Sequence, residues 1–360
     1  MPRVIGIDPG TISTDICGLD NGRLFLDESV RTADAVADPG RFVARLEAHA
    51  PIDLIAGPSG YGLPFVAGRD VTETDLRLAF LAAEGEPGGI GGLRALARAL
   101  AHSSLPVVFT PGVIHLDSVP AHRKINRVDI GTADKVCATV LAVRELAAQK
   151  RCAYSDISFV LAELGGAFTA AIAVHRGRIV DGLGGSSGPL GFRAAGALDG
   201  EVAFLADRVD KSMIFSGGAA SVAGTDDPDV LVRRGSAATR IAADAYIEST
   251  VKAVAALCVS VPDSAHLLLS GRLAGVRGVR DELARQIAVV RAGMTVELLR
   301  GFAASAKHAA QGAAVLADGL VGGRDAALVD SLGLRDARGT ALDHLYLISP
   351  AQARTRLGIV

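Results

Sequence analysis

The chain has 360 residues, of which 49% are hydrophobic, and its mean hydropathy is +0.35. A chain of this length and composition can bury a large core, and its length indicates two domains rather than one. The formal net charge is only -2, so no basic surface suggests nucleic acid or an anionic membrane as a partner. We therefore expect a protein with small-molecule partners.

The four cysteines, Cys17, Cys137, Cys152 and Cys258, lack the close pairs that a zinc or iron-sulfur site needs. Each stands in an apolar stretch, so we interpret them as reduced core residues. The sequence opens on a strand pattern rather than on a basic segment with an apolar signal core, and no apolar run approaches about eighteen residues. These features predict a cytoplasmic protein.

One pattern occurs twice, in residues 4–27 and 158–182. It consists of an apolar run, an acid, a glycine turn, a second apolar run and a glycine followed by arginine. In the first copy Asp8 precedes Gly10 by two residues and Gly22 by fourteen. In the second copy Glu163 precedes Gly165 by two residues and Gly177 by fourteen. The sequence therefore predicts an internal repeat of a β-hairpin with a glycine tip.

A glycine turn after an acid has a chemical use, because glycine lets backbone N–H groups approach an anion and nearby hydroxyls add donors. Two such turns facing each other would grip the phosphates of one nucleotide. Either copy alone is better interpreted as an ordinary hairpin. The matched spacing favours the nucleotide interpretation.

Strands and helices alternate in residues 39–111. Apolar residues at helical spacing predict helices over residues 39–50 and 91–103, and apolar runs predict strands at 53–56 and 105–111. This order predicts a mostly parallel sheet with helices on its faces. Ligands of such sheets gather at the carboxyl ends of the strands, where residues 57–62 and 110–117 would lie.

A charged cluster precedes a long amphipathic helix that ends near residue 150. Its members are Asp129, Thr132, Asp134 and Lys135, close to Arg123, Lys124 and Asn126. Any one acid here is explained as a helix N-terminal cap. The density of charge at a predicted sheet edge makes the cluster a candidate site.

The second half continues with a glycine-rich passage at residues 181–200, which is either a flexible surface loop or, as its apolar residues favour, a packed loop beside the site. We then predict a helix at 235–259, a buried strand at 265–271 and a helix at 277–288. Residues 306–323 form an Ala/Gly-rich helix whose small residues suit a tight helix contact. Residues 341–349 are strand-like, and the last segment, 350–360, is not placed.

Two glycine turns resemble those of a known superfamily. Asp8 to Ser13 resembles the first phosphate loop of sugar kinases, and Leu164 to Gly166 the second, within the acetate and sugar kinase, actin and heat-shock ATPase superfamily. Further blocks resemble butyrate and acetate kinases, in particular the family of predicted butyrate kinases: LIAGPSGYG, HLDSVPAHRKIN, GTAD, ELGGAFTAAIAVHRGRIVDG, GGSSGPLGFRAAGALD, LLLSGRL and AAQGAAVLADG. They cover most of residues 4–322.

The resemblance implies an α/β, two-lobed, duplicated actin-like or ribonuclease H-like ATPase fold with a cleft between the lobes. The lobes would be residues 1–145 and 146–335, with a C-terminal extension at 336–360. It implies a Mg-ATP-dependent kinase acting on a small molecule, and it leaves a homodimer open. The alternative is a nucleotide-dependent switch that acts on a partner protein. The sequence has no cysteine cluster, which argues against the activator ATPases of this superfamily that carry an iron-sulfur centre. It also has no H-x-x-x-H pair, which argues against the metal-bearing branch of the superfamily.

Several positions depart from the acyl-kinase pattern. The turn at residues 57–60 lacks the arginine that holds the acid substrate, and Thr110 or Pro111 replaces a catalytic aspartate. Asp134 and Glu163 stand where histidines are expected, and Asp8 replaces an asparagine. The motifs expected to bind the nucleotide are therefore retained, whereas those expected to bind the acid substrate differ from the acyl-kinase pattern. We expect acetate and butyrate to be poor substrates.

Phosphoryl transfer needs mainly positioning and charge neutralisation. Asp8 and Glu163 are candidates for holding Mg²⁺ through water, since magnesium keeps several waters. The expected phosphate-binding residues are Gly10, Thr11, Ser13, Gly165, Gly166 and Thr169. Those expected beside the nucleoside of ATP are Ser270, Gly271, Arg272 and Gly312. The acceptor-side candidates are Asp129, Asp134, Lys135 and Arg123, with Asp117 as a substitute for the displaced acid.

Overall fold

The computed structural model describes residues 2–57, 60–83 and 89–359 and divides the chain into two compact units. Unit 1 contains residues 1–128, 132–156 and 300–360, and unit 2 contains residues 129–131 and 157–299. These bounds differ from the expected lobes 1–145 and 146–335 and the extension 336–360. The difference arises because the chain returns at residue 300 to pack with the first strands.

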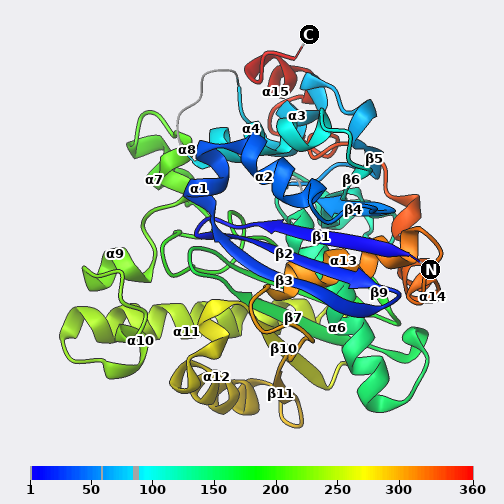
Figure 1. Cartoon of the computed structure of the whole chain (residues 1–360). Helices are drawn as coiled ribbons and strands as arrows, with labels where there is room; N and C mark the ends of the chain where they lie inside the picture. Colours follow the sequence, from blue (N-terminus) through cyan, green and yellow to red (C-terminus); the bar gives the residue numbers. More distant parts are fainter. Residues whose placement is uncertain (1, 58–59, 84–88, 360) are drawn as a thin grey trace. The chain divides into compact units, whose positions relative to one another are not determined.

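Unit 1 is built on a six-stranded sheet with the order β3-β2-β1-β4-β6-β5 (Figure 1). Its strands are β1 Arg3–Pro9, β2 Ser13–Asp20, β3 Arg23–Arg31, β4 Leu54–Gly57, β5 Val66–Ala67 and β6 Val107–Phe109. β1, β4 and β6 run parallel, whereas β2 and β3 continue the sheet in antiparallel fashion. The parallel strands expected from the alternating pattern are confirmed.

Helices of unit 1 pack on both faces of this sheet. They are α1 Thr32–Ala37, α2 Pro39–Glu47, α3 Glu73–Phe80, α4 Gly89–Ala101, α5 Ala121–Lys124, α6 Ala133–Lys150, α13 His308–Leu320, α14 Ala326–Leu332 and α15 Pro350–Arg356. Successive residues of a strand point to opposite faces. Accordingly, Ile5 and Ile7 of β1 join a buried cluster with Phe42 of α2, while Gly6 lies against α13.

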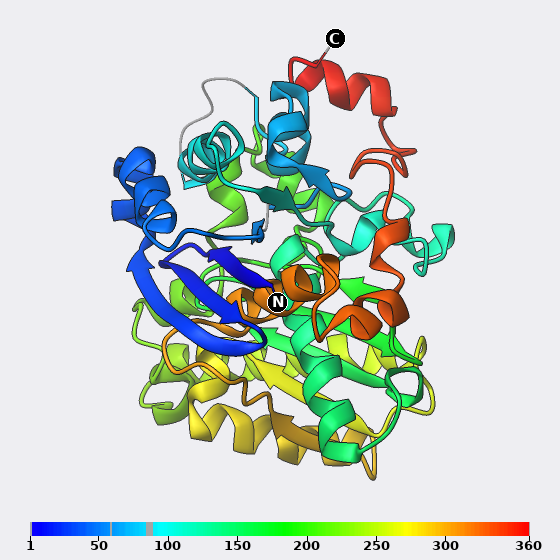
Figure 2. The ribbon, with the colours of Figure 1, turned by 45° about the vertical axis from the view of Figure 1, so that its right-hand side comes forward.

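Helix α13 lies unusually close to β1. A Cβ atom at residue 6 would lie only 2.1 Å from the backbone nitrogen of Ala314, so glycine is needed there. Figure 2 shows α13, in orange, beside α6, and the two helices are in contact. A second glycine, Gly312, faces the Cys137 carbonyl of α6, which a Cβ would approach to 1.8 Å. The tight helix contact expected of the Ala/Gly-rich segment is confirmed.

Both predicted hairpins are present, and their tips have the same conformation. Asn21 and Gly22 join β2 to β3 with φ values of 51° and 71°, and Arg176 and Gly177 occupy the same places in unit 2 with 48° and 73°. Positive φ at both central residues is the mark of a type I′ turn, which suits the twist of antiparallel strands.

The repeat extends beyond the tips. β2 and β3 shift register between Gly18 and Leu19, and the corresponding strands of unit 2 shift between Ala173 and Val174. Each shift lies four residues before the tip glycine, so one bulge occurs at the same position in both copies. The internal repeat is therefore confirmed as a structural one.

Unit 2 is built on a five-stranded sheet with the order β11-β10-β7-β8-β9. Its strands are β7 Phe159–Leu164, β8 Thr169–His175, β9 Arg178–Leu183, β10 His266–Ser270 and β11 Thr295–Leu298. Its helices are α7 Gly200–Leu205, α8 Lys211–Ile214, α9 Ala219–Ala223, α10 Val230–Arg233, α11 Ala237–Cys258 and α12 Arg277–Val290. As in unit 1, an antiparallel pair continues a set of parallel strands, here β7, β10 and β11.

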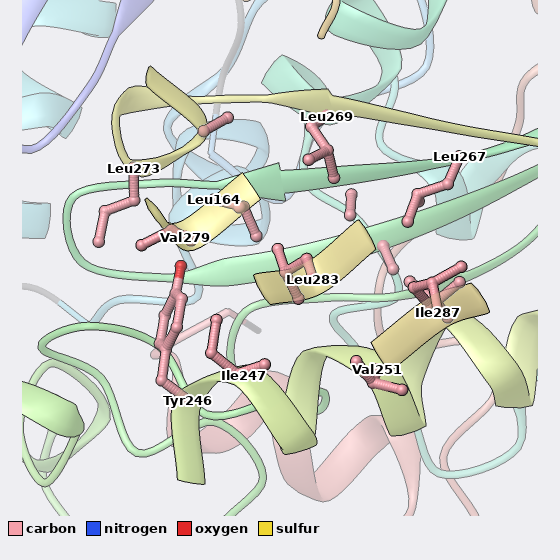
Figure 3. Packing of buried hydrophobic residues seen from close by; sticks show 14 of the residues in the cluster. Leu164, Tyr246, Ile247, Val251, Leu267, Leu269, Leu273, Val279, Leu283 and Ile287 are labelled. Carbon is pink, nitrogen blue, oxygen red and sulfur yellow. The ribbon is translucent and has the colours of Figure 1, made fainter. Parts of the chain in front are cut away.

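The core of unit 2 lies between its sheet and two helices (Figure 3). Leu267 and Leu269 of β10 pack with Ile247 and Val251 of α11 and with Leu283 of α12. Alternate residues of a strand and residues spaced along one helix face supply this cluster, as the sequence pattern predicts. The predicted helices at 235–259 and 277–288 are confirmed.

The predicted strand at residues 341–349 is wrong. The side-chain oxygen of Asn126 accepts the N–H groups of Tyr346 and Leu347 at 2.7 and 2.8 Å, so these donors do not enter a sheet. The chain then forms α15, which begins at Pro350 and is capped by the Ser349 hydroxyl. Proline in the first turn and serine at the cap are the usual start of a helix.

Helix α6 also differs from its expected amphipathic form, because it is buried on most sides rather than along one stripe. Just beyond it, Cys152 is exposed, so its interpretation as a core residue is wrong; the other three cysteines are buried. Within the described ranges, none of the helices has the length and apolar content that a membrane crossing requires.

Candidate functional site

The first glycine turns of the two repeats share one geometry. The Gly10 N–H donates to the Ser13 carbonyl at 3.0 Å, and the Gly165 N–H donates to the Phe168 carbonyl at 2.9 Å. A Cβ atom at residue 10 or 165 would lie 2.9 or 2.7 Å from that carbonyl oxygen, so both turns need glycine. Each turn presents bare backbone directly after an acid-bearing strand, which is suitable for approach by an anion.

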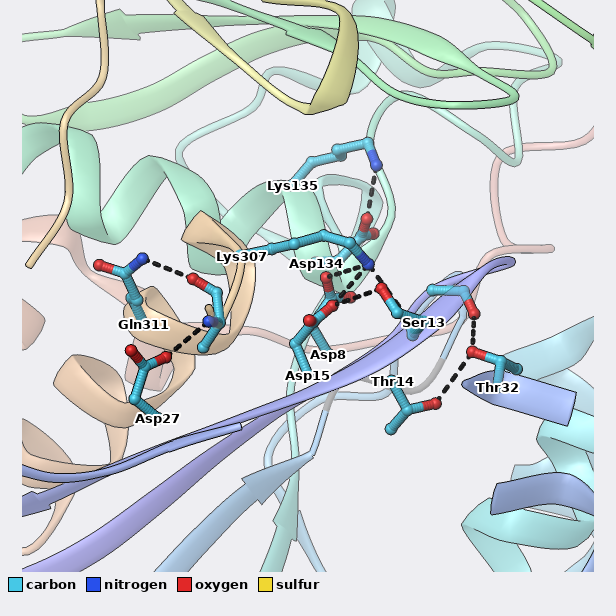
Figure 4. A network of polar contacts seen from close by, with 12 residues as sticks. Asp8, Ser13, Thr14, Asp15, Asp27, Thr32, Asp134, Lys135, Lys307 and Gln311 are labelled. Carbon is cyan, nitrogen blue, oxygen red and sulfur yellow. Dashed lines mark hydrogen bonds and ion pairs between the residues drawn. The ribbon is translucent and has the colours of Figure 1, made fainter. Parts of the chain in front are cut away.

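Two buried aspartates and one lysine meet beside the first turn (Figure 4). Asp8 of β1 and Asp15 of β2 are only 6% and 1% exposed. The Lys307 ammonium, which precedes α13, lies 2.6 Å from the Asp15 carboxylate and 3.9 Å from that of Asp8. It also donates to the Ser13 carbonyl at 3.1 Å. A cation therefore lies on the turn that the sequence identifies as a phosphate loop.

Burial raises the pKa of Asp8 to about 7, although the Lys307 ammonium opposes this shift. The carboxylates of Asp134 and Asp15 raise the pKa further, and Lys135 lowers it. The structure therefore brings the predicted Asp8, Asp134 and Lys135 into one electrostatic cluster. The pKa of Asp8 lies near neutral pH chiefly because burial disfavours its charged form, and the neighbouring carboxylates add to this effect.

Asp134 stands in the first turn of α6 and remains ionised. Burial alone would raise its pKa, but the Lys135 ammonium at 2.5 Å and the Thr132 hydroxyl at 2.5 Å hold the pKa below its usual range. Asp8 and Asp134 are thus neighbouring acids whose environments push their pKa values apart. In such a pair, Asp8 can donate a proton while Asp134, which stays charged, can accept one.

The first turn fits a magnesium ion held in the usual way. The Asp15 Oδ1 atom is buried and has no hydrogen-bond partner among the described residues. Within the same ranges, no group of three or more His, Cys, Asp or Glu side chains could hold a metal. Mg²⁺ usually takes one or two carboxylates and keeps its waters or binds phosphate oxygens. Asp8 and Asp15 suit that arrangement, and a closed protein cage is not formed.

The segment that carries Lys307 is fixed by side chains of unit 1. Asp27 of β3 accepts the N–H groups of residues 304–306 at 2.7 to 3.0 Å. Burial alone would raise the Asp27 pKa, but these N–H groups lower it. Gln311 of α13 accepts the Phe302 N–H at 2.6 Å. The sequence interpretation missed Lys307, Asp15 and Asp27, because no spacing links these residues along the chain.

In unit 2 the predicted residues gather at the carboxyl ends of β7 and β10. Glu163 stands opposite Ser270 in the parallel register. Gly271 has a φ of 88°, and a Cβ there would lie 2.5 Å from the Leu164 carbonyl oxygen. Arg272 follows at once and starts a short 3-10 helix. The edge that holds the second glycine turn therefore also holds the predicted Ser-Gly-Arg corner.

The second turn also contains Thr169, whose hydroxyl is buried and lies 3.3 Å from the Tyr246 hydroxyl. Burial raises the pKa of Tyr246, so the phenol stays neutral. Gly166 stands between Gly165 and the strand that Thr169 begins. Phosphate binding by these residues stays a prediction.

Asp129 lies in unit 2, whereas Asp134 and Lys135 lie in unit 1. Its carboxylate accepts the Gly131 N–H at 3.1 Å and both the N–H and hydroxyl of Ser186 at 2.9 Å. These bonds occupy both oxygens and anchor the glycine-rich passage that follows β9. The passage is therefore packed as far as Gly196, whereas Leu198, one of its apolar residues, is exposed. Asp129 has a clear structural task.

Residues 6–347 match the family described as "Protein of unknown function (DUF1464)". The chain belongs to this family. No curated protein matches the sequence at a significant level.

Solved structures of acyl kinases have a similar fold. A propionate kinase from Francisella tularensis subsp. tularensis SCHU S4 gives a TM-score of 0.65 at 12% identity, over 87% of this chain and 98% of that one. An acetate kinase from Porphyromonas gingivalis gives 0.62 at 12% identity, over 87% and 98%. An acetate kinase from Entamoeba histolytica gives 0.60 at 11% identity, over 80% and 87%. The DUF1464 chain thus has the duplicated α/β fold of these acetate and propionate kinases, as expected.

The other site residues predicted from the sequence of the DUF1464 chain lie in different environments. Asp117 forms an ion pair of 2.7 Å with Arg338, so the proposed substitute acid already has a partner. Arg123 is half-buried on α5. Gly312 is explained by its contact with α6 without any ligand. Thr11 is exposed on the first turn. Residues 58–59 of the turn that lacks an arginine lie outside the described residues.

Proposed function

We propose that the chain binds Mg-ATP and transfers a phosphoryl group to a small-molecule acceptor. One observation carries this proposal: the turns at Gly10 and Gly165 have the same hydrogen bond, the same need for glycine and the same preceding acid position. A duplicated pair of anion-binding turns is suited to a polyphosphate. The fold likeness to acetate and propionate kinases supports the assignment.

In unit 1, the hydroxyls of Thr11 and Ser13 would bind phosphate oxygens, and Gly10, whose N–H is used within the turn, would let them approach because it has no side chain. Asp8 and Asp15 would hold Mg²⁺ through its waters, and the ion when bound would neutralise charge on the phosphates. The Lys307 ammonium, which lies on the turn, would contribute a second positive charge. In unit 2, Glu163 is the corresponding acid of the second repeat and would hold Mg²⁺ through water.

The remaining unit 2 residues would bind the rest of the nucleotide. Gly165 and Gly166 would contact phosphates, whereas buried Thr169 would support the turn from behind. The corner of Ser270, Gly271 and Arg272 would border the nucleoside. The register pair of Glu163 with Ser270 supports this grouping, because it brings the turn and the corner to one sheet edge.

For the acceptor side we propose Asp134 and Lys135. Ionised Asp134 would orient or accept the proton of an acceptor hydroxyl, and Lys135 holds it in that state. The block resemblance to predicted butyrate kinases suggests a carboxylate acceptor. We nevertheless propose a larger or hydroxylated acceptor, because no arginine stands in the turn at residues 57–60.

Calorimetric titration tests the nucleotide site. ATP and ADP should bind in the presence of magnesium and much more weakly in its absence. Asp8→Asn and Asp8→Ala should lose at least roughly tenfold of the magnesium-dependent affinity, since a charge-assisted contact is removed. Asp156→Ala, an exposed acid of unit 1, is the matched control and should bind normally.

Failure of every purine nucleotide to bind would reject the proposal. Magnesium-dependent ATP hydrolysis that no acceptor accelerates would instead favour the nucleotide-dependent switch. Normal binding by both Asp8 variants would reject Asp8 as the metal-holding residue while leaving the nucleotide site intact.

A further inference from the structure

A pocket of about 750 Å³ lies in unit 1 at the carboxyl-terminal half of α6. Its walls come from that half of α6 and residues 151–154, from residues 301–302 and from residues 324–325. Small-molecule sites commonly have volumes of about 300 to 1,000 Å³. The pocket is therefore large enough for a small organic ligand.

The two acids of this pocket already have partners within the protein. Asp325 pairs with Arg144 at 2.8 Å. The Glu145 carboxylate accepts the N–H groups of Arg300 and Gly301 at 2.9 and 2.8 Å. The pocket is thus lined by three arginines, Arg144, Arg151 and Arg324, against two acids.

Two further arginines line the same pocket, Arg151 and Arg324. Among the described residues, neither guanidinium lies within ion-pair distance of a carboxylate, although the charge of Arg324 acts on Asp325 from further away and lowers its pKa. The pocket thus has a surplus of positive charge. Guanidinium groups bind carboxylate and phosphate in a planar, two-pronged fashion.

Local packing holds Arg324 in place. A Cβ at Gly22 would lie 2.7 Å from the Arg324 Cδ, so the stem of this arginine rests on the tip of the first hairpin. The N–H groups of Arg151 and Cys152 bond the Ala147 carbonyl, so the carbonyl end of α6 is satisfied rather than turned into the pocket.

One wall of the pocket is apolar. The Phe302 ring lies 5.6 Å below the Arg144 guanidinium, and Leu141, Ala148 and Tyr154 add carbon surface. A ligand with an aromatic or aliphatic body would bury this surface, which a free inorganic ion would leave wet. The site combines a charged contact with an apolar one.

The pocket is distinct from the nucleotide site. Asp134 begins α6, whereas Arg144 and Arg151 lie about 15 and 25 Å further along its axis. We propose that this pocket binds a small organic anion, in which a phosphate or carboxylate group is attached to an apolar body. The proposal does not depend on nucleotide binding.

Phenyl phosphate is the probe, and benzyl alcohol and inorganic phosphate are its two partial analogues. Calorimetry on the full chain should give saturable binding of phenyl phosphate, weaker binding of phosphate and none of benzyl alcohol. Arg151→Ala and Arg324→Ala should each weaken phenyl phosphate binding by roughly tenfold. Arg240→Ala, an exposed arginine of unit 2, is the matched control and should bind as the unaltered chain does.

Cys152 provides a second test of where phenyl phosphate binds. It lines the pocket and is exposed, while the other cysteines are buried. Saturating phenyl phosphate should slow alkylation of Cys152 by iodoacetamide, measured by mass spectrometry. Equal binding of benzyl alcohol, unchanged binding by both pocket variants, or unprotected Cys152 would each overturn the proposal.

Discussion

The Lys307 ammonium lies 2.6 Å from the Asp15 carboxylate, although the two residues stand near opposite ends of the sequence. Asp15 is 1% exposed, so the Lys307 ammonium compensates a carboxylate that water does not reach. The contact joins β2 to the segment that precedes α13 and places positive charge on the first glycine turn.

Lys307→Ala should destabilise the chain by about 1 to 3 kcal/mol, because it leaves buried carboxylates without their cation. The free energy of unfolding in urea at pH 7.5 measures this. Lys150→Ala, at the exposed end of α6, should change stability by less than about 0.5 kcal/mol. Asp15→Asn should recover part of the loss in the double variant. A double variant as unstable as the sum of the two single ones would contradict the pairing.

Asp8→Asn should change the pH dependence of stability. The pKa of Asp8 is raised from 3.8 to about 7 in the fold, so its stabilising contribution is complete below pH 3.8 and is lost as pH rises through 7. Asparagine does not titrate. The stability of Asp8→Asn relative to the unaltered chain should therefore rise by about 2 kcal/mol between pH 5 and pH 8.

Urea unfolding of both proteins at the two pH values measures this difference. Asp156→Asn, at an exposed position, provides the control and should show no such change. A constant difference between Asp8→Asn and the unaltered chain would show that Asp8 does not titrate near neutral pH.

Gly312→Ala should be strongly destabilising, by about 2 kcal/mol or more, because its Cβ would lie 1.8 Å from the Cys137 carbonyl oxygen. The same change at Gly200, the first residue of α7, meets nothing within 4 Å and should cost less than about 0.5 kcal/mol. Thermal unfolding compares the two. Similar melting temperatures would mean that α6 and α13 separate at little cost.

Acetate and butyrate should be poor phosphoryl acceptors. A carboxylate in a closed site needs a cation, the turn at residues 57–60 has no arginine, and Lys135 already pairs with Asp134. A hydroxylamine trap detects acyl phosphate from these acids, and ADP release detects transfer to a panel of hydroxylated acceptors. We expect the best hydroxylated acceptor to exceed butyrate by at least roughly tenfold. Rapid hydroxamate formation with butyrate would show the opposite.

The sequence by itself determined the local elements and their repetition. Glycine after an acid, and a glycine fourteen residues further on, predicted two hairpins, and the structure shows equal tips at Gly22 and Gly177. Apolar periodicity also predicted α11 and α12. These features depend on backbone torsions and on which face a residue occupies, and both are encoded by neighbouring residues.

Only the tertiary structure decided which distant groups share a site. Lys307 pairs with Asp15, and Asp129 accepts a hydrogen bond from Ser186. Asn126 accepts one from the segment at residues 341–349 that was expected to be a strand. None of these contacts has a sequence period, because each depends on how separate elements pack. Gly6 permits the close approach of α13 to β1. Only the packed structure shows that this approach brings Lys307, just before α13, to the first glycine turn.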